Sequence, residues 1–196
     1  MALSNYTELQ ASIANWLSRS DLGAVIPDFI ALAESDIADD VRIRPTVTTI
    51  TTVAGQDYVT LPADWLEFVY IKYQGEPLEY APPDVIRSQS NWTGKPRQYS
   101  IEGRRLLLSP TQLDAITLDV SYHARIPALS VTPTNWLLTE NPSVYLWRSL
   151  VHAGIFVQDD AIATRFDALY KATVQSLTGK DQKSNSSGSP LRIRTR

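Results

Sequence analysis

The stretch Pro45-Thr46-Val47-Thr48-Thr49-Ile50-Thr51-Thr52-Val53 marks the point at which the sequence changes its period. Every residue from Thr46 to Val53 is β-branched, which favours an extended strand over a helix. Pro45 cannot continue a helix, because its ring clashes with the preceding turn and it lacks an N–H. The stretch therefore predicts a boundary near residue 45, with helices before it and a sheet after it.

On the N-terminal side of this boundary, apolar residues recur at helical spacing in two segments. The first helix is expected over residues 6–18, with Asn5 and Glu8 at the spacing of a capping box. The second is expected to begin at Pro27, a residue suited to a first helical turn, and to end before Pro45. Each segment has one apolar face, so the two helices should form a pair.

On the C-terminal side, strand-like segments alternate with turn residues. Residues 58–61 are expected to pair back onto the opening strand, through the turn at Ala54-Gly55-Gln56. Pro82-Pro83-Asp84 is expected to begin a short helix. Further strands are predicted over residues 65–73, 98–102, 105–109 and 117–126, with Gly103-Arg104 as the turn of a hairpin.

Helical spacing returns after Asn135. A helix over residues 144–157 is apolar nearly all round, which predicts burial, and Asn141 is expected to cap it. Asp159 and Asp160 are expected at the start of a last helix, where capping and the helix dipole favour carboxylates, and Gly179 at its left-handed stop. The rest of the chain is poor in apolar residues and predicts a segment that does not fold alone.

Together these elements predict an α+β fold. Its helical bundle is formed by the N-terminal and C-terminal helix pairs, with an inserted antiparallel β-module and an extended C-terminal tail. The expected divisions are residues 1–45 for the first helix pair, 46–133 for the β-module, 134–179 for the second helix pair, and 180–196 for the tail.

Charge is unevenly placed along the chain. The total is −3, but the side chains of residues 1–179 sum to −7 and those of residues 180–196 to +4. An acidic body does not bind nucleic acid by neutralising phosphates, which argues against a DNA-binding packaging accessory. The basic tail is typical of a tether to a partner. With no signal peptide and no apolar run long enough for a membrane span, the protein is expected to be made in the cytoplasm.

Residues that could carry out chemistry are few. The chain has no cysteine, and its two histidines, His123 and His152, lack a second ligand at helical spacing. No nucleophile elbow, phosphate loop or dinucleotide-binding glycine pattern occurs. The pairs Asp39-Asp40 and Asp159-Asp160 diverge if helical, so neither pair converges on one substrate atom. We expect no catalytic residue, no metal and no cofactor.

The five tryptophans suggest where the protein makes contacts. Trp16 and Trp147 lie on apolar helical faces and are predicted in the core. Trp92 and Trp136 lie in predicted loops, where an assembly contact is favoured because aromatic residues are enriched at interfaces. The alternative is a glycan-binding or glycan-processing protein, which would place two carboxylates in a cleft beside one of these rings.

Several short motifs, taken in order, resemble the head-to-tail adaptors of tailed bacteriophages. They run over nearly all of residues 1–179 and include Tyr6-Thr7-Glu8-Leu9, Ile26-Pro27-Asp28-Phe29-Ile30, Gly94-Lys95-Pro96-Arg97, Tyr99, Gly103, Leu106-Leu107-Leu108-Ser109-Pro110, Thr134-Asn135-Trp136-Leu137-Leu138, Pro142, Tyr145-Leu146, Leu150, Asp159-Asp160 and Tyr170.

The resemblance implies a structural protein of the virion neck. Members of this family form a ring, commonly of twelve copies, between the portal protein and a tail or nozzle protein, and DNA passes through the ring without sequence-specific binding. The resemblance and the alternating basic sequence predict a portal-binding tail: Pro190, Leu191, Arg192, Ile193, Arg194 and Arg196. The candidate subunit interface consists of Trp92, Pro96 and Trp136.

Overall fold

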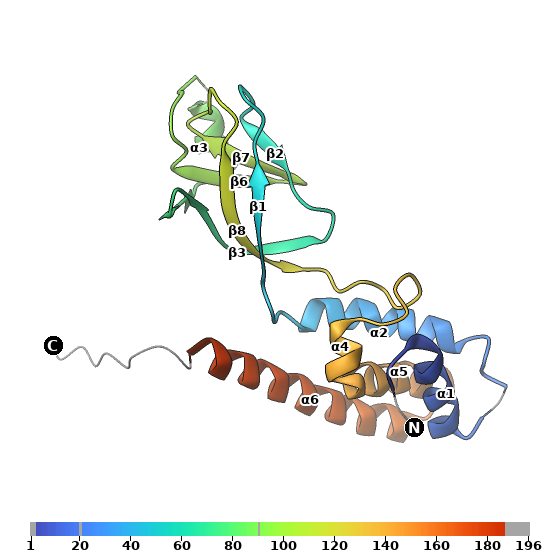
Figure 1. Cartoon of the computed structure of the whole chain (residues 1–196). Coiled ribbons are helices and arrows are strands. Elements are labelled where there is room, and N and C mark those ends of the chain that lie inside the picture. Colours follow the sequence, from blue (N-terminus) through green and yellow to red (C-terminus); the bar gives the residue numbers. More distant parts are fainter. Residues whose placement is uncertain (1–2, 20, 90, 187–196) are drawn as a thin grey trace, which may run out of the picture. The chain divides into compact units, whose positions relative to one another are not determined.

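A computed structural model describes residues 3–19, 21–89 and 91–186 of the chain. The chain divides into two compact units (Figure 1). The helical unit contains Met1–Ile43 and Ile126–Arg196, and the β unit contains Arg44–Arg125. The predicted α+β fold, with a β-module inserted between helix pairs, is confirmed.

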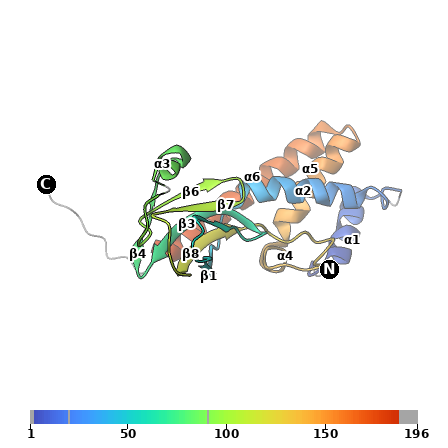
Figure 2. The ribbon, with the colours of Figure 1, turned by 90° about the horizontal axis from the view of Figure 1, so that it is seen from above.

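The helical unit draws on both ends of the chain. Its helices are α1 (Tyr6–Leu17), α2 (Ile26–Asp40), α4 (Trp136–Glu140), α5 (Pro142–Phe156) and α6 (Asp160–Ser186). One core cluster joins them, with the fully buried Leu9, Ile30 and Leu150 among its members. Figures 1 and 2 both show α6 running beside α5. Residues 126–133 belong to this unit, because Leu129 is buried in its core and donates its N–H to the Glu34 carboxylate at 2.6 Å.

The ends of the helices follow the predicted chemistry in part. Asn5 caps α1 by accepting from the Glu8 N–H at 2.9 Å, whereas the Glu8 carboxylate accepts from the Ser4 N–H. Asn135 caps α4 in the same way, accepting from the Leu138 N–H at 2.8 Å. Asn141 is the N-cap residue of α5 and Pro142 lies in its first turn, as predicted, but the Asn141 side chain makes no capping hydrogen bond. The Asn141 N–H donates to the Leu137 carbonyl at the end of α4, and the Asn141 carbonyl accepts from the Val144 N–H at the start of α5, so this residue links the two helices through its backbone.

The predicted helix stop at Gly179 is wrong, and so is an extended tail beginning at residue 180, because α6 continues to Ser186. Glycine permits the left-handed conformation but does not impose it. The residues that follow, Lys180-Asp181-Gln182-Lys183, include good helix formers that continue the turn. The predicted portal-binding residues 190–196 lie outside the described residues.

The β unit is built from short segments close together in sequence. They are β1 (Thr46–Thr51), β2 (Tyr58–Thr60), β3 (Trp65–Tyr73), β4 (Glu76–Pro77), β5 (Glu79–Tyr80), α3 (Pro83–Ser88), β6 (Gln98–Glu102), β7 (Arg105–Ser109) and β8 (Thr117–Ala124). The strands form two sheets of four, with orders β1-β8-β3-β4 and β2-β7-β6-β5. Both sheets contribute to one core, in which Leu106, Leu108, Leu118 and Val120 are buried.

Strand pairing corrects one prediction. Residues 58–60 pair with β7 and not with β1, whose antiparallel partner is β8. After β1, the Thr52 N–H donates to the Ile116 carbonyl at 2.9 Å, next to the first sheet. The Asp57 carbonyl accepts from the Leu108 N–H of β7 at 2.9 Å, in the second sheet. The turn between Thr52 and Asp57 therefore takes the chain from one sheet to the other. The hairpin at Gly103-Arg104 is confirmed, with Gly103 at a φ of 58° and Glu102 opposite Arg105.

Candidate assembly surfaces

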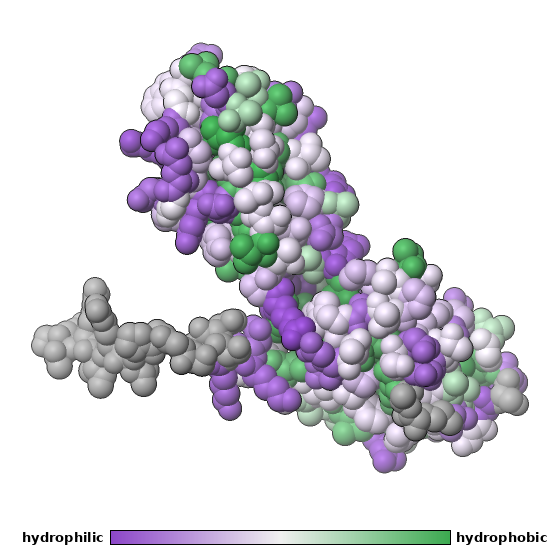
Figure 3. All heavy atoms as spheres, in the orientation of Figure 1, coloured by the Kyte–Doolittle hydropathy of each residue, from purple (hydrophilic) through white to green (hydrophobic). Residues whose placement is uncertain are grey.

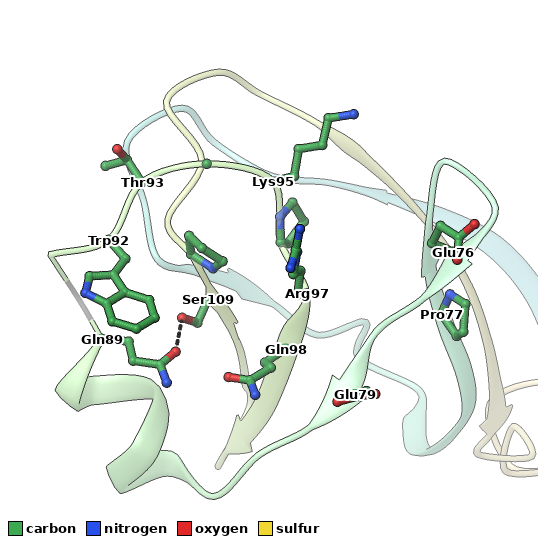
Figure 4. A pocket seen from close by; sticks show the side chains of 13 residues that line it. Glu76, Pro77, Glu79, Gln89, Trp92, Thr93, Lys95, Arg97, Gln98 and Ser109 are labelled. Atoms are coloured by element: carbon green, nitrogen blue, oxygen red, sulfur yellow. Dashed lines mark hydrogen bonds between the residues drawn. The ribbon is translucent and has the colours of Figure 1, made fainter.

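The β unit has an open groove of about 900 Å³ beside the edge of its second sheet (Figure 4). Its lining side chains come from β4, β5, β6, β7, the residue that follows α3 and the loop over residues 91–97. They include Glu76, Pro77, Glu79, Gln89, Trp92, Thr93, Lys95, Arg97, Gln98 and Ser109. At the floor, the Ser109 hydroxyl donates to the Gln89 side-chain carbonyl at 2.9 Å. We call this feature the groove.

The loop that carries Trp92 is fixed by its backbone. The Trp92 carbonyl accepts from the Thr111 N–H at 2.8 Å, and the Thr111 carbonyl accepts from the Gly94 N–H at 3.0 Å. Arg97 then enters the sheet, donating its N–H to the Ser109 carbonyl at 2.9 Å. The Trp92 side chain nevertheless remains 60% exposed. A large ring held out on a fixed backbone loses little conformational entropy on binding, which suits an interface contact.

Charges of both signs line the groove. Glu76 and Glu79 lie on one side, and Lys95 and Arg97 on the other, with Trp92 in the same depression (Figure 4). All four charged residues are exposed. Lys95 donates to the Gln74 side chain at 3.1 Å. Such a surface suits a polar partner that brings complementary charges, because exposed pairs set orientation more than affinity.

The predicted interface residues lie in different surroundings. Trp92 is exposed in the groove, whereas Pro96 is buried beneath the same loop. Trp136 begins α4 and is partly buried against the core of the helical unit. The structure therefore places Trp92 and Pro96 in one loop of the β unit and Trp136 in the helical unit.

The helical unit has an aromatic cluster at the end of α1. Trp147 stacks on Phe166 at 5.5 Å between ring centroids, and Trp16 meets both rings edge-on at 5.3 and 5.8 Å. The prediction that Trp16 is a core residue is wrong, because its side chain is 51% exposed. It lies in the last turn of α1.

Polar side chains tie α2 to α5 and α6. The Asp36 carboxylate accepts from Arg148 and from His152, each at 2.7 Å, and Arg148 also donates to Asp167 at 3.1 Å. Burial alone would raise the pKa of Asp36, but hydrogen bonds from Arg148 and His152 hold that pKa below its usual range.

Two buried tyrosines complete this polar framework. Burial raises the pKa of Tyr145 to about 12, while its hydroxyl bonds Asn135 at 2.8 Å. Burial also raises the pKa of Tyr170, and the Asp40 carboxylate that accepts from its hydroxyl at 2.8 Å adds to the shift. Both hydroxyls therefore remain protonated near neutral pH; that of Tyr145 accepts from the Asn135 side-chain amide, and that of Tyr170 donates to Asp40.

The model of the family described as SU10 adaptor protein matches residues 4–194 of the chain. The chain belongs to this family of phage head-to-tail adaptors. The resemblance drawn from the short motifs is thereby confirmed. No curated protein matches the sequence.

Membership implies that the adaptor is a structural protein of the phage particle, which interacts with other head and tail proteins and is not an enzyme. Within residues 3–19, 21–89 and 91–186, no three His, Asp or Glu side chains are grouped to hold a metal ion. His152 is a hydrogen-bonded structural residue, as predicted. In the same described part, no helix combines the length and apolar character of a membrane span.

Sequence reasoning missed one wall of the groove. The strands β4 and β5 have only two residues each, too few for an alternating pattern, so Glu76 and Glu79 gave no signal of a shared surface. The available signal was the pair of turn residues on either side, Gly75 and Pro82, which left room for a brief edge strand in the adaptor.

Proposed function

We propose that this adaptor forms a closed ring below the portal, linking the capsid to the tail and continuing the channel through which DNA leaves the head. The observation that carries the proposal is the family match over residues 4–194, nearly the whole chain. A ring of about twelve copies would present the same heterologous contact between every pair of neighbours. The tail-side neighbour would be a tail or nozzle protein.

The exposed Trp92 supports a contact between subunits. Its ring is held on an anchored loop, and burying a large apolar side chain contributes roughly 1.5–3 kcal/mol. A ring repeats that contribution at each interface. Of the three predicted interface residues, Trp92 has the most exposed side chain, and we propose it as the principal contact of the β unit.

The basic C-terminal segment supports attachment to the portal. Leu191-Arg192-Ile193-Arg194-Thr195-Arg196 alternates apolar or β-branched residues with arginine, a pattern that suits an added strand whose guanidinium groups pair with acidic side chains. Removing residues 187–196 leaves all of α6 in place. This truncation should preserve folding and abolish portal binding in a pull-down with the portal; unchanged binding would contradict the attachment.

The acidic body supports a channel role. Residues 1–179 carry a net charge of −7, and a wall of like charge does not hold passing DNA. Localisation of the adaptor to the virion neck follows from the same proposal.

The decisive experiment is the stoichiometry of the assembled protein. Native mass spectrometry of the purified full chain, together with cryo-electron microscopy of the particle neck, should give one closed ring of adaptors between portal and tail. A monomer at all concentrations, and no ring in the neck, would contradict the proposal.

One observation favours a second candidate function. The groove holds Trp92 together with Glu76 and Glu79, which are the residue types of a glycan site. Both carboxylates are exposed in the open groove, however. Binding of bacterial surface glycans on an array, lost in Trp92→Ala, would favour this function over ring contact.

A further inference from the structure

The helical unit exposes two apolar surfaces, and they lie on different faces of α5. The first, which we call the knob, consists of Leu32, Ile155 and Phe156, with exposed fractions of 52%, 61% and 55%. Phe156 contacts the buried Phe29 at 5.3 Å between ring centroids, and Leu32 lies one turn further along α2. The contact with the buried Phe29 therefore holds the Phe156 side chain of the knob in place.

The second surface, which we call the hollow, is an open depression of about 530 Å³. Leu3, Ser12, Asn15, Trp16 and Leu146 line it. Trp16 forms part of the aromatic cluster with Trp147 and Phe166, so one wall of the hollow is fixed by ring contacts. A depression of this size is large enough to receive bulky apolar side chains.

Helical geometry places the two surfaces back to back. Ile155 follows Leu146 by nine residues, and Phe156 follows Trp147 by the same interval. At about 100° a residue, that interval turns the side chain by about 180° around the axis of α5. The knob and the hollow of one molecule therefore cannot meet, whereas the knob of one copy can enter the hollow of the next.

Charges at the margins fit this pairing. Exposed carboxylates border the knob: Asp28 lies four residues before Leu32 on α2, and Asp160 begins α6 directly after the α5–α6 turn. Beside the hollow, the exposed Arg165 lies over the Phe166 ring at 5.9 Å. Arg19, three residues after Trp16, is paired with Asp21, with 2.5 Å between the charged atoms. Arg165 is thus placed to meet the acidic margin of a neighbour's knob.

We propose that the occupant of the hollow is the knob of a second copy of this chain, and that repetition of this heterologous contact closes the ring. The inference rests on the proposed function, since it names the surfaces by which the proposed ring is built. Scattered apolar side chains are normal on a protein surface, as Figure 3 shows for both units. Here, however, one surface consists of well-exposed side chains, the other is a depression, and they lie on opposite faces of α5.

Cysteine cross-linking tests the pairing, because the chain has no cysteine of its own. The double variant Asn15→Cys with Ile155→Cys places one thiol at the hollow and one at the knob. Treated with a short bismaleimide, the full-length protein should yield a ladder of covalent oligomers ending at the ring size. The matched control is Asn15→Cys with Val131→Cys, since Val131 is an exposed residue of the same unit outside both surfaces. It should give at least about tenfold less ladder.

The outcomes separate the pairing from the ring itself. A dimer from Ile155→Cys alone would mean that knob meets knob, and equal ladders from the test and control pairs would mean that the contact is unspecific; either result overturns the inference. A ring in native mass spectrometry of the unmodified protein without a ladder overturns the inference and leaves the proposed function standing. A monomer in both measurements overturns both.

Discussion

The helical unit and the β unit differ in how far their stabilising contacts reach along the chain. In the helical unit, Asp36 meets Arg148 across 112 residues and Asp40 meets Tyr170 across 130. The β unit is one continuous segment, and its sheets are completed within residues 44–125. A unit closed within one segment can fold without the rest of the chain, whereas the helical unit needs both ends. The comparison therefore predicts separate responses to mutation in the two units.

The largest effects are expected from cavities in the two cores. Leu150→Ala in α5 and Leu118→Ala in β8 each remove a fully buried side chain and should lower the free energy of unfolding by about 2–5 kcal/mol. Leu150→Ala should shift the helical transition, followed by circular dichroism at 222 nm in urea, while leaving unchanged the protection of the β-unit strands from amide hydrogen exchange. One merged transition in both variants would show that the units do not unfold separately. Leu113→Ala, at an exposed position, is the control.

Two glycines of the helical unit should respond with opposite signs. A Cβ at Gly154 would lie 2.8 Å from the Ala163 backbone nitrogen, so Gly154→Ala should separate α5 from α6 and cost about 1–3 kcal/mol. At Gly179 nothing lies within 4 Å, and the residue is inside α6. Gly179→Ala should therefore stabilise the protein by about 0.5–1 kcal/mol, because alanine loses less entropy in a helix. Thermal unfolding measures both; a loss of stability in Gly179→Ala would contradict the continuous helix.

Acid should weaken the helical unit through Asp36. Its folded pKa is depressed, so the ionised carboxylate stabilises the fold above the unfolded pKa, near 4. That contribution is lost as the pH falls through the folded pKa. After allowance for solvent screening, Asp36→Asn should cost about 1 kcal/mol at pH 7, and the difference from wild type should vanish towards pH 2. Urea unfolding at several pH values tests this, with the exposed Asp39→Asn as control. A difference independent of pH would exclude the ion pair as its cause.

The smallest effect on folding is expected in the groove. Trp92→Ala removes an exposed ring from an anchored loop, so the melting temperature of the isolated subunit should change by less than about 2 °C. Assembly should weaken by about tenfold or more, measured as the concentration at which half of the protein is in rings. A variant that assembles normally would remove Trp92 from the subunit interface.

Much of the secondary structure was predictable because the signals were local. The β-branched run of β1, the aromatic and branched residues of β3, and the turn at Gly103-Arg104 each specify their own backbone conformation. Errors occurred where a residue allows a helix to end or to be capped but does not require it. Gly179 allows a helix to end without ending it, and Asn141 has a capping side chain that α5 does not use.

Only one wall of the groove, the loop that carries Trp92, could be predicted from the sequence. Trp92 and Pro96 were predicted as interface residues in a loop, and Trp92 does lie exposed there. Glu79 joins it through a parallel pairing of β5 with β6, opposite Gln98, and Glu76 through an antiparallel pairing of β4 with β3, opposite Tyr73. A pairing of two residues leaves no periodic trace in the sequence, so the second wall could not be foreseen.

The amino-acid sequence by itself determined the order of elements, the α+β class and the adaptor resemblance. These depend on residue type, periodicity and short motifs, which are all local in the sequence. Only the tertiary structure decided that β2 joins β7, that Trp16 lies half exposed beside Trp147, and that apolar residues of α5 emerge on two opposite faces. The physical reason is that pairing and burial depend on residues far apart in the chain, whose approach is set by the packing of the whole unit.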